Sequence, residues 1–178
     1  MEKFVIKGGR PLKGTIEVKG AKNAALKVLA ASLLSDEEWT ISNVPQIEDI
    51  FCLIELLKRI GAEVKNDSEG VYQIKAKNIK DTYLEPSIAQ KLKGSIVMAG
   101  PLLARKGEAF FPHPGGCVIG QRPRDIFLDG FKAFGVKIKE NRNGYHLTTK
   151  KLKGTKFVFP KISVTATETL MLTAVLAQ

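Results

Sequence analysis

A thiol, three glycines and a fixed cation are combined in one stretch of ten residues, PGGCVIGQRP at 114–123. Glycine lets the backbone approach a ligand closely or adopt positive φ, and this run is untypical of a regular helix or strand. Cys117 stands near Arg122 and Arg124 and just before a predicted helix, surroundings that favour the nucleophilic thiolate. The alternative interpretation is a surface loop with an incidental, half-buried cysteine. Cys117 and Arg122 are therefore candidate catalytic residues.

Polar and charged residues also stand at the predicted starts of several helices. These residues are Lys22 and Asn23, Lys91 and Lys93, Arg122 to Asp125, and Ser163 with Thr165. Free backbone N–H groups and the positive end of the dipole make a helix start favourable for an anion, and a lysine adds a full charge. Each start alone has an ordinary alternative, which is a solvated lysine or a simple cap. If the helices converge, the starts together favour one polyanionic, phosphate-bearing ligand.

The predicted elements occur twice in the same order. The first copy is expected to contain helices over 20–34 and 47–60 and strands over 39–44, 62–64 and 71–75. The second is expected to contain helices over 90–105 and 125–134 and strands over 136–139 and 145–148. Gly61 and Gly135 stop equivalent helices 74 residues apart, so the repeat is a long supersecondary unit. A third copy begins near Lys161 with a predicted capping box at 165–168, and the chain is expected to be cut within it.

Apolar spacing gives further expectations for the N-terminus and the core. Residues 3–7 and 14–19 alternate or are β-rich, so they are expected to form a hairpin-like pair of strands. The helix from residue 20 is apolar nearly all round and is expected to be buried. Cys52, on the helix over 47–60, is expected to be a core or boundary thiol. The same helix is expected to turn these residues inward: Ile47, Ile50, Phe51, Ile54 and Leu57.

The bulk composition disfavours several classes of protein. With 28 Lys+Arg against 18 Asp+Glu, the net charge of +10 favours anionic partners. Aromatic residues make up only 7% and no RNA-recognition signature, zinc-finger spacing or basic zipper region is found, so we expect no nucleic-acid partner. No apolar run reaches the ~18–20 residues of a membrane span, and no signal peptide is visible. Neither the cysteines nor the histidines have metal-ligand spacing, so we expect a cytoplasmic protein without metal or cofactor.

Three sequence segments carry a family resemblance. GAKNAAL at 20–26, PGGCVIGQRP at 114–123 and SVTATE at 163–168 resemble, in order and spacing, the front part of the UDP-N-acetylglucosamine enolpyruvyl transferases. The resemblance covers the whole chain, although family members are more than twice as long. It implies an α/β (α+β) fold, an inside-out barrel of βαβαββ-type repeats with pseudo-threefold symmetry and a truncated third repeat. It also implies that residues 1–20 are strands of an absent second domain, and that 21–178 form the barrel domain, with repeats at about 21–86, 87–155 and 156–178.

The resemblance also implies roles for individual residues. Cys117 matches the loop cysteine that acts as general acid toward the phosphoenolpyruvate methylene and is alkylated by fosfomycin. Lys22 and Asn23 match the pair that contacts phosphoenolpyruvate and the sugar. The family's segment that binds the uridine diphosphate end of the substrate corresponds to Arg122, Pro123, Arg124, Asp125 and Ile126. A further contact with the nucleotide sugar is matched by Lys161, Ile162, Ser163 and Val164. Lys93 replaces a usual arginine, which keeps the charge but loses the bidentate fork, and Val97 replaces a frequent tryptophan.

The resemblance implies transfer of the enolpyruvyl group of phosphoenolpyruvate to the 3-hydroxyl of UDP-N-acetylglucosamine with release of phosphate, the first committed step of peptidoglycan synthesis. Cys117, Lys22 and Arg122 suit the general acid and the fixed cations that this reaction needs. The family's general base lies in the part that this chain lacks, so we expect the chain to need a C-terminal half and to be inactive alone. The alternatives are a shikimate-pathway enolpyruvyl transferase, which lacks a cysteine in this loop, and a non-catalytic basic binding module.

Overall fold

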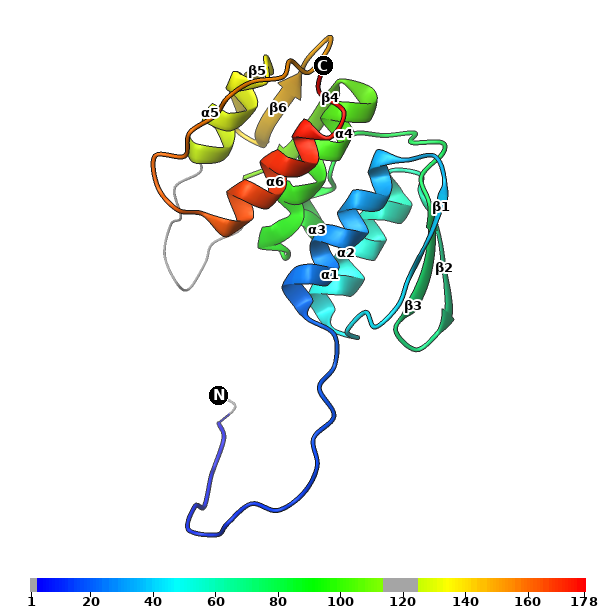
Figure 1. Ribbon diagram of the computed structural model, residues 1–178, viewed down its shortest axis with the longest axis vertical. Coiled ribbons are helices and arrows are strands. Elements are labelled where there is room, and N and C mark those ends of the chain that lie inside the picture. Colours follow the sequence, from blue (N-terminus) through cyan, green and yellow to red (C-terminus); the bar gives the residue numbers. More distant parts are fainter. Residues whose placement is uncertain (1–2, 114–124) are drawn as a thin grey trace.

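The N-terminal arm leaves the body of the protein as an extended segment (Figure 1). The computed structural model describes residues 3–113 and 125–178, and residues 3–20 contain no strand. Apolar side chains of the arm, among them Phe4 and Leu12, are fully exposed to solvent. The predicted hairpin of 3–7 and 14–19 is therefore wrong for this chain, because a hairpin with no third strand or helix against it is marginal in water.

The body contains the same order of elements twice. The first copy consists of α1 (Lys22–Ala31), the 3₁₀ helix η1 (Ser32–Leu34), β1 (Glu38–Ile41), α2 (Glu48–Arg59), β2 (Glu63–Ser68) and β3 (Val71–Lys75). The second consists of α3 (Pro86–Ala89), the 3₁₀ helix η2 (Lys93–Met98), α4 (Ala99–Lys106), β4 (Glu108–Pro112), α5 (Asp125–Ala133), β5 (Lys137–Asn141) and β6 (Gly144–Thr148). Helix α6 (Val164–Ala174) follows.

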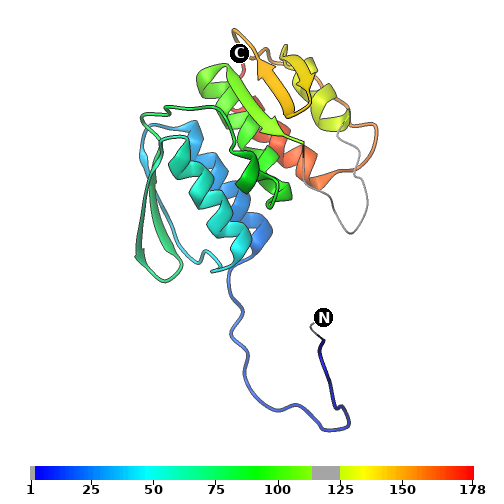
Figure 2. The ribbon, with the colours of Figure 1, turned by 180° about the vertical axis from the view of Figure 1, so that it is seen from behind.

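Each copy forms a three-stranded antiparallel sheet in which the last strand lies in the middle. The strand orders are β1-β3-β2 and β4-β6-β5, so the predicted supersecondary repeat is confirmed. Within the described residues the two sheets stay separate and do not close into a barrel. What the structure shows is a mixed α/β arrangement, with helices packed between two small sheets (Figure 2).

The equivalent helices α2 and α5 end in the same hydrogen-bonded motif. Gly61 has a φ of 103° and Gly135 a φ of 82°, values that favour glycine. After α2, Gly61 N donates to Lys58 O at 3.0 Å and Ala62 N donates to Leu57 O at 2.9 Å. After α5, the amides of 135 and 136 repeat this pattern at 2.9 and 3.1 Å. This is the Schellman arrangement, so the prediction that these glycines stop equivalent helices is confirmed.

Three local predictions are wrong for identifiable reasons. The helix expected over 90–105 is divided into η2 and α4, because Pro101 lacks an N–H that could donate to the carbonyl of residue 97 in the preceding turn. Strand β4 was not predicted, since its five residues are few and end in proline. Helix α6 is capped by Ser163, whose Oγ accepts a hydrogen bond from Ala166 N, and not by the predicted box at 165–168.

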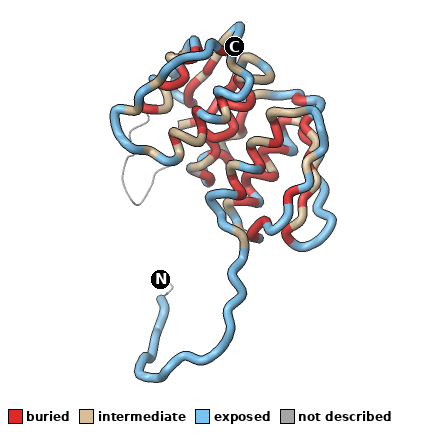
Figure 3. Tube along the Cα trace, in the orientation of Figure 1, coloured by how far each residue is buried: buried red, intermediate tan, exposed pale blue. Residues whose placement is uncertain are grey.

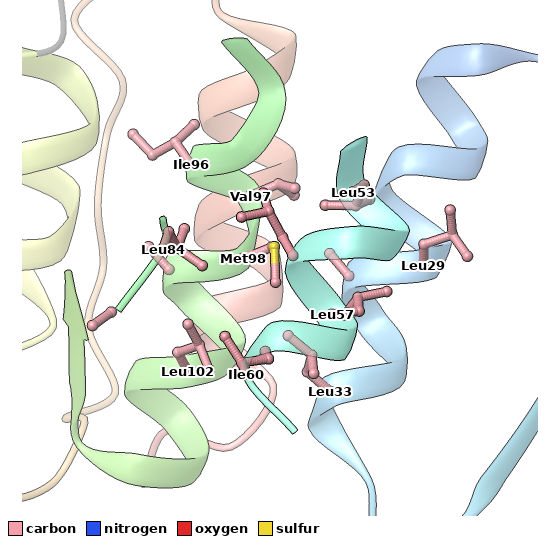
Figure 4. Close-up of a cluster of buried hydrophobic side chains, with 14 of the residues drawn as sticks. Leu29, Leu33, Leu53, Leu57, Ile60, Leu84, Ile96, Val97, Met98 and Leu102 are labelled. Atoms are coloured by element: carbon pink, nitrogen blue, oxygen red, sulfur yellow. The ribbon is translucent and has the colours of Figure 1, made fainter. Parts of the chain in front are cut away.

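The core lies where the helices face one another and the inner faces of the sheets (Figure 3). Leu29 of α1, Leu53 and Leu57 of α2, and Met98 and Leu102 of the second copy are fully buried and belong to one cluster of hydrophobic side chains (Figure 4). Two predictions need correction. Phe51 is 44% exposed although its helix neighbours are buried, and α1 is not buried all round, since Val28 is exposed. No helix in the described part of the chain has the length and apolar character needed to cross a membrane.

Candidate functional site at the helix starts

Several helices begin toward the same end of the protein. In Figures 1 and 2, helices α1, α2, α5 and α6 run in one direction, with their first residues toward the end from which the N-terminal arm departs. The Nζ atom of Lys22 lies 2.8 Å from Asp49 Oδ2, which joins the starts of α1 and α2. The Nζ atom of Lys27 lies 2.9 Å from Glu168 Oε2, which joins the second turn of α1 to the second turn of α6. Dipoles and free N–H groups oriented alike make this end favourable for anions.

The start of α1 presents a cation in a fixed position. Lys22 is the first residue of α1, and its side chain is 49% exposed while it is paired with Asp49. The N-cap residue is Ala21, and no side chain in the described residues caps the helix, so the N–H groups of the first turn stay available. Asn23 is exposed beside Lys22. An ammonium, an amide side chain and free N–H groups therefore face solvent together.

Asp49 is the functional candidate that sequence reasoning missed. A carboxylate in the first turn of a helix is an ordinary complement to the dipole, and α2 carries both Glu48 and Asp49 there. Its partner Lys22 lies 27 residues earlier in the chain. Only the packing of α1 against α2 shows that one of these two carboxylates holds the lysine, and no local sequence signal separates them.

The start of α6 combines a hydrogen-bonding cap with exposed apolar side chains. Ser163 Oγ accepts from Ala166 N at 3.3 Å, which leaves its hydroxyl proton to donate to a ligand. Lys161 is exposed, and the exposed fractions of Ile162 and Val164 are 99% and 70%. The predicted contact residues 161–164 therefore form a surface with cationic, hydrogen-bonding and apolar character.

The remaining predicted residues fall into two groups. Asp125 is exposed in the first turn of α5, but Ile126 is buried, so it can contact a ligand only through its backbone. Lys93 is the first residue of η2. The other four lie outside the described residues, and their roles stay predictions: Cys117, Arg122, Pro123 and Arg124.

Neither histidine belongs to a metal site in the described residues, where no group of at least three His, Cys, Asp or Glu side chains could hold a metal ion. The Nε2 atom of His113 lies 2.9 Å from Asn141 O, and that of His146 lies 2.6 Å from Glu108 Oε1. Both rings are engaged by residues of the second sheet.

Cys52 is a buried thiol, as predicted, with a weak hydrogen bond to Glu48. Burial is the main factor that raises the pKa of the Cys52 thiol above its usual value, and the charge of Glu48, that hydrogen bond and the charge of Asp49 act in the same direction. The charge of Lys91 opposes them only in part. Because a raised thiol pKa lowers the thiolate fraction at neutral pH, Cys52 reacts slowly with electrophiles.

We therefore expect slow alkylation of Cys52. At pH 7, iodoacetamide should modify Cys52 at least about tenfold more slowly than a free cysteine, and the rate should keep rising as the pH passes the ordinary thiol pKa. Peptide mass spectrometry of the folded chain over a pH series measures this rate. Cys117 in the same sample is the internal comparison, and equal labelling of the two thiols at pH 7 would contradict the assignment.

Repeated α-β-α-β-β units with helix starts toward one end, which favours anions, define a repeat-built α/β protein. The chain belongs to the EPSP synthase (3-phosphoshikimate 1-carboxyvinyltransferase) family, whose model matches residues 6–178.

Curated relatives are similar to the chain in sequence, and solved structures are similar to it in fold. The chain is 40% identical over its whole length to a protein of Coxiella burnetii and 42% identical to one of Dinoroseobacter shibae, both named UDP-N-acetylglucosamine 1-carboxyvinyltransferase. It spans about two fifths of their length, 41% and 43%. Its fold is similar to the enolpyruvyl transferase NikO of Streptomyces tendae, with a TM-score of 0.70 at 24% identity over 82% of this chain and 32% of that one. EPSP synthase from Acinetobacter baumannii gives a TM-score of 0.69 at 16% identity over 93% of this chain and 38% of that one.

Proposed function

We propose that this chain is the front part of an enzyme that transfers the enolpyruvyl group of phosphoenolpyruvate to the 3-hydroxyl of UDP-N-acetylglucosamine and releases phosphate. The observation that carries the proposal is the common orientation of the starts of α1 and α6, which brings Lys22, Asn23 and Ser163 toward one end. Relatives at 40–42% identity, named for this reaction, support it. The same step in peptidoglycan synthesis, in the cytoplasm, is the proposed biological setting.

The residues suit a reaction that passes through a tetrahedral ketal. The sugar hydroxyl gives up its proton to the general base and adds to C2 of phosphoenolpyruvate, while C3 gains a proton from the general acid. C3 then loses a proton, phosphate leaves from C2, and the C2–C3 double bond re-forms. Cys117 is proposed as the general acid toward C3. Lys22 and Arg122 stabilise the carboxylate and phosphate charges. The ion pair with Asp49 fixes the Lys22 ammonium before the substrate arrives.

The nucleotide sugar is proposed to lie between the starts of α5 and α6. Arg122 to Ile126 would bind the diphosphate end, with Ile126 contributing only backbone atoms because its side chain is buried. Lys161 to Val164 would supply a second contact, and the exposed Ile162 and Val164 offer apolar surface to the base. Lys93, the first residue of η2, is proposed as a further cation for the ligand, with a point charge in place of the bidentate fork of an arginine.

The complete enzyme is proposed to contain this chain joined to a segment that corresponds to the rest of its relatives' length. That segment would complete the third repeat after α6, close an inside-out barrel over residues 21–178, and supply the general base. The exposed apolar side chains of residues 3–20 support a role for the arm as strands of the second domain. On this account the chain alone is inactive.

The Asp49→Asn substitution in the complete enzyme should separate binding from turnover. Loss of the carboxylate frees Lys22 to move and raises the positive potential at the site, so kcat should fall about tenfold while KM for phosphoenolpyruvate stays constant or falls. Steady-state phosphate release measures both quantities. Asp129→Asn is the matched control, because Asp129 pairs with Lys132 on the surface of α5 at 3.3 Å. A higher KM with unchanged kcat would contradict the positioning role of Asp49.

Hydrogen exchange on the complete enzyme tests the proposed site. UDP-N-acetylglucosamine should slow amide exchange at 20–27 and 159–168 and leave β2 and β3 unchanged. Shikimate 3-phosphate, the acceptor of the shikimate-pathway alternative, should not protect these segments. Protection by shikimate 3-phosphate alone would favour that alternative. Equal protection by a short DNA duplex that vanishes steeply with added salt would favour the basic binding module.

A further inference from the structure

A hollow of about 470 Å³ lies against the second sheet, and no step of the proposed reaction uses it. Its volume falls within the range of small-molecule sites, about 300–1,000 Å³. The lining combines two aromatic rings, two carboxylates, an imidazole and side-chain amides, and includes Tyr83, Phe110, Asp81, Glu108, His146 and Asn143. This mixture of ring faces and planar polar groups is suited to a ligand that is apolar on one face and polar at its edges.

Residues 82–84 carry one of these rings to the edge of the sheet. Tyr83 forms a parallel bridge with Phe110 of β4. Phe110 N donates to Thr82 O at 2.9 Å, and Leu84 N donates to Phe110 O at 3.1 Å. The segment therefore acts as a short fourth strand beside β4, and it fixes Tyr83 by backbone bonds on both sides.

The two rings lie on the outer face of the sheet. Side chains alternate along a strand, and the neighbours of Phe110, Ala109 and Phe111, belong to the hydrophobic core. Phe110 therefore points outward, beside its register partner His146. Its ring stacks on Tyr83, with centroids 4.5 Å apart and an interplanar angle of 9°. Tyr83 is 41% exposed, so it covers Phe110 and still presents aromatic surface to the hollow.

The first sheet shows that the fold itself does not require these aromatics. In β1, Thr40 pairs with Gln73 at the position where Phe110 pairs with His146, as the neighbouring inward pairs Trp39–Ile74 and Ala109–Leu147 establish. The outer row of the first sheet is thus polar at this place. The stacked aromatic pair occurs in the second copy and not at the equivalent place in the first. This difference indicates that the pair serves to contact a ligand and is not needed for packing of the fold.

We propose that this hollow binds the ring of an uncharged sugar. One face of a pyranose presents polarised C–H bonds, which are attracted to the negative face of an aromatic ring such as that of Tyr83. Its hydroxyl groups both donate and accept, which matches the carboxylate of Glu108, the imidazole of His146 and the amide of Asn143. The Glu108–His146 contact of 2.6 Å holds both polar groups in a defined orientation.

The charges of the lining separate this site from the helix starts. Asp81 and Glu108 contribute carboxylates, and no lysine or arginine in the described residues lines the hollow, although the chain carries a net charge of +10. Phosphate and nucleotide are therefore disfavoured here. The site would bind a sugar without acting on it, so it goes beyond the proposed transfer reaction and does not depend on it.

Nuclear magnetic resonance on the chain tests the proposal with methyl β-D-glucopyranoside and methyl N-acetyl-β-D-glucosaminide as probes. Millimolar probe should shift the ring signals of Tyr83 and the side-chain amide of Asn143, with saturation transfer to the C–H protons of the sugar. Tyr83→Ser should weaken binding at least about tenfold. Phe51→Ser, at an aromatic that is 44% exposed on α2, is the matched control and should leave binding unchanged.

Asn143→Ala is a second variant that leaves the aromatic stack intact, so it remains informative if Tyr83→Ser does not fold. It should weaken binding at least about threefold. Both variants should leave phosphate release by the complete enzyme unchanged, so failure here and failure of the proposed reaction are distinguishable. The proposal is overturned if millimolar sugar changes no chemical shifts, or changes only those of residues outside the hollow. It is also overturned if methylguanidinium binds in the hollow and neither sugar does.

Discussion

Replacing Cys117 by alanine in the complete enzyme is expected to reduce phosphate release from phosphoenolpyruvate at least about 100-fold. General acid catalysis contributes about 10²–10⁴ to rate, and the other thiol of this chain cannot take over, because Cys52 is buried and the pKa of its thiol is raised. UDP-N-acetylglucosamine binding should persist, since the helix starts and their N–H groups are untouched. Stopped phosphate release with retained hydrogen-exchange protection at 159–168 is the expected pair of results.

Cys52→Ala is the matched control for this experiment. It removes the other cysteine of the chain, so it tests whether loss of any thiol has the effect. Turnover should stay within about twofold of the unaltered enzyme, since the substitution is a modest change inside α2. Cys117→Ala with normal turnover would remove the thiol from the mechanism.

Gly100→Ala is expected to cause a large loss of stability for a change of one methyl group. A Cβ atom at Gly100 would lie 2.5 Å from Thr173 Oγ1 and 2.9 Å from Thr169 O, so α4 and α6 would have to move apart. The Thr173 hydroxyl cannot simply turn away, because it donates to Thr169 O at 2.8 Å. Overpacking of this kind costs about 1–3 kcal/mol. After subtraction of the roughly 1 kcal/mol that alanine gains over glycine in a helix, the expected net loss is up to about 2 kcal/mol, toward the upper end because the contacts are so short.

Urea unfolding of the chain followed by circular dichroism measures this effect. Gly94→Ala is the matched control, since a Cβ at Gly94 would meet only Leu26 Cδ1 at 3.5 Å and Leu92 Cδ1 at 3.7 Å, which are ordinary contacts. Its free energy of unfolding should stay within about 0.5 kcal/mol of the unaltered chain. Equal effects of the two substitutions would mean that α4 and α6 do not pack at this distance.

The repeat was predictable because its signals are local. The helix α2 has acidic residues in its first turn, basic residues in its last turn and Gly61 at its stop, and α5 ends at Gly135 in the same way. Each of these features acts within one turn of helix, so it can be read without knowledge of the packing. The hairpins β2–β3 and β5–β6 were predictable for the same reason, since apolar residues flank the turns that end at Gly70 and Gly144.

Predictions that depend on distant partners were less successful. The β-rich residues 3–7 and 14–19 have no partner in the described chain and stay extended and exposed. Strand β4 exists because β6 pairs with it, and its own five residues give little signal. In the candidate site, Lys22 and Ser163 were predictable as helix starts, but the ion pair with Asp49 depends on how α1 packs against α2. Side-chain pairing across helices is therefore the information that the sequence did not provide.

Phosphate release from phosphoenolpyruvate by the complete enzyme, measured with and without UDP-N-acetylglucosamine, is the most direct measurement of the proposed function. The account predicts release that requires the nucleotide sugar, is not supported by shikimate 3-phosphate, and is absent with residues 1–178 alone. No release in the presence of both proposed substrates, from a folded and complete enzyme, would contradict it.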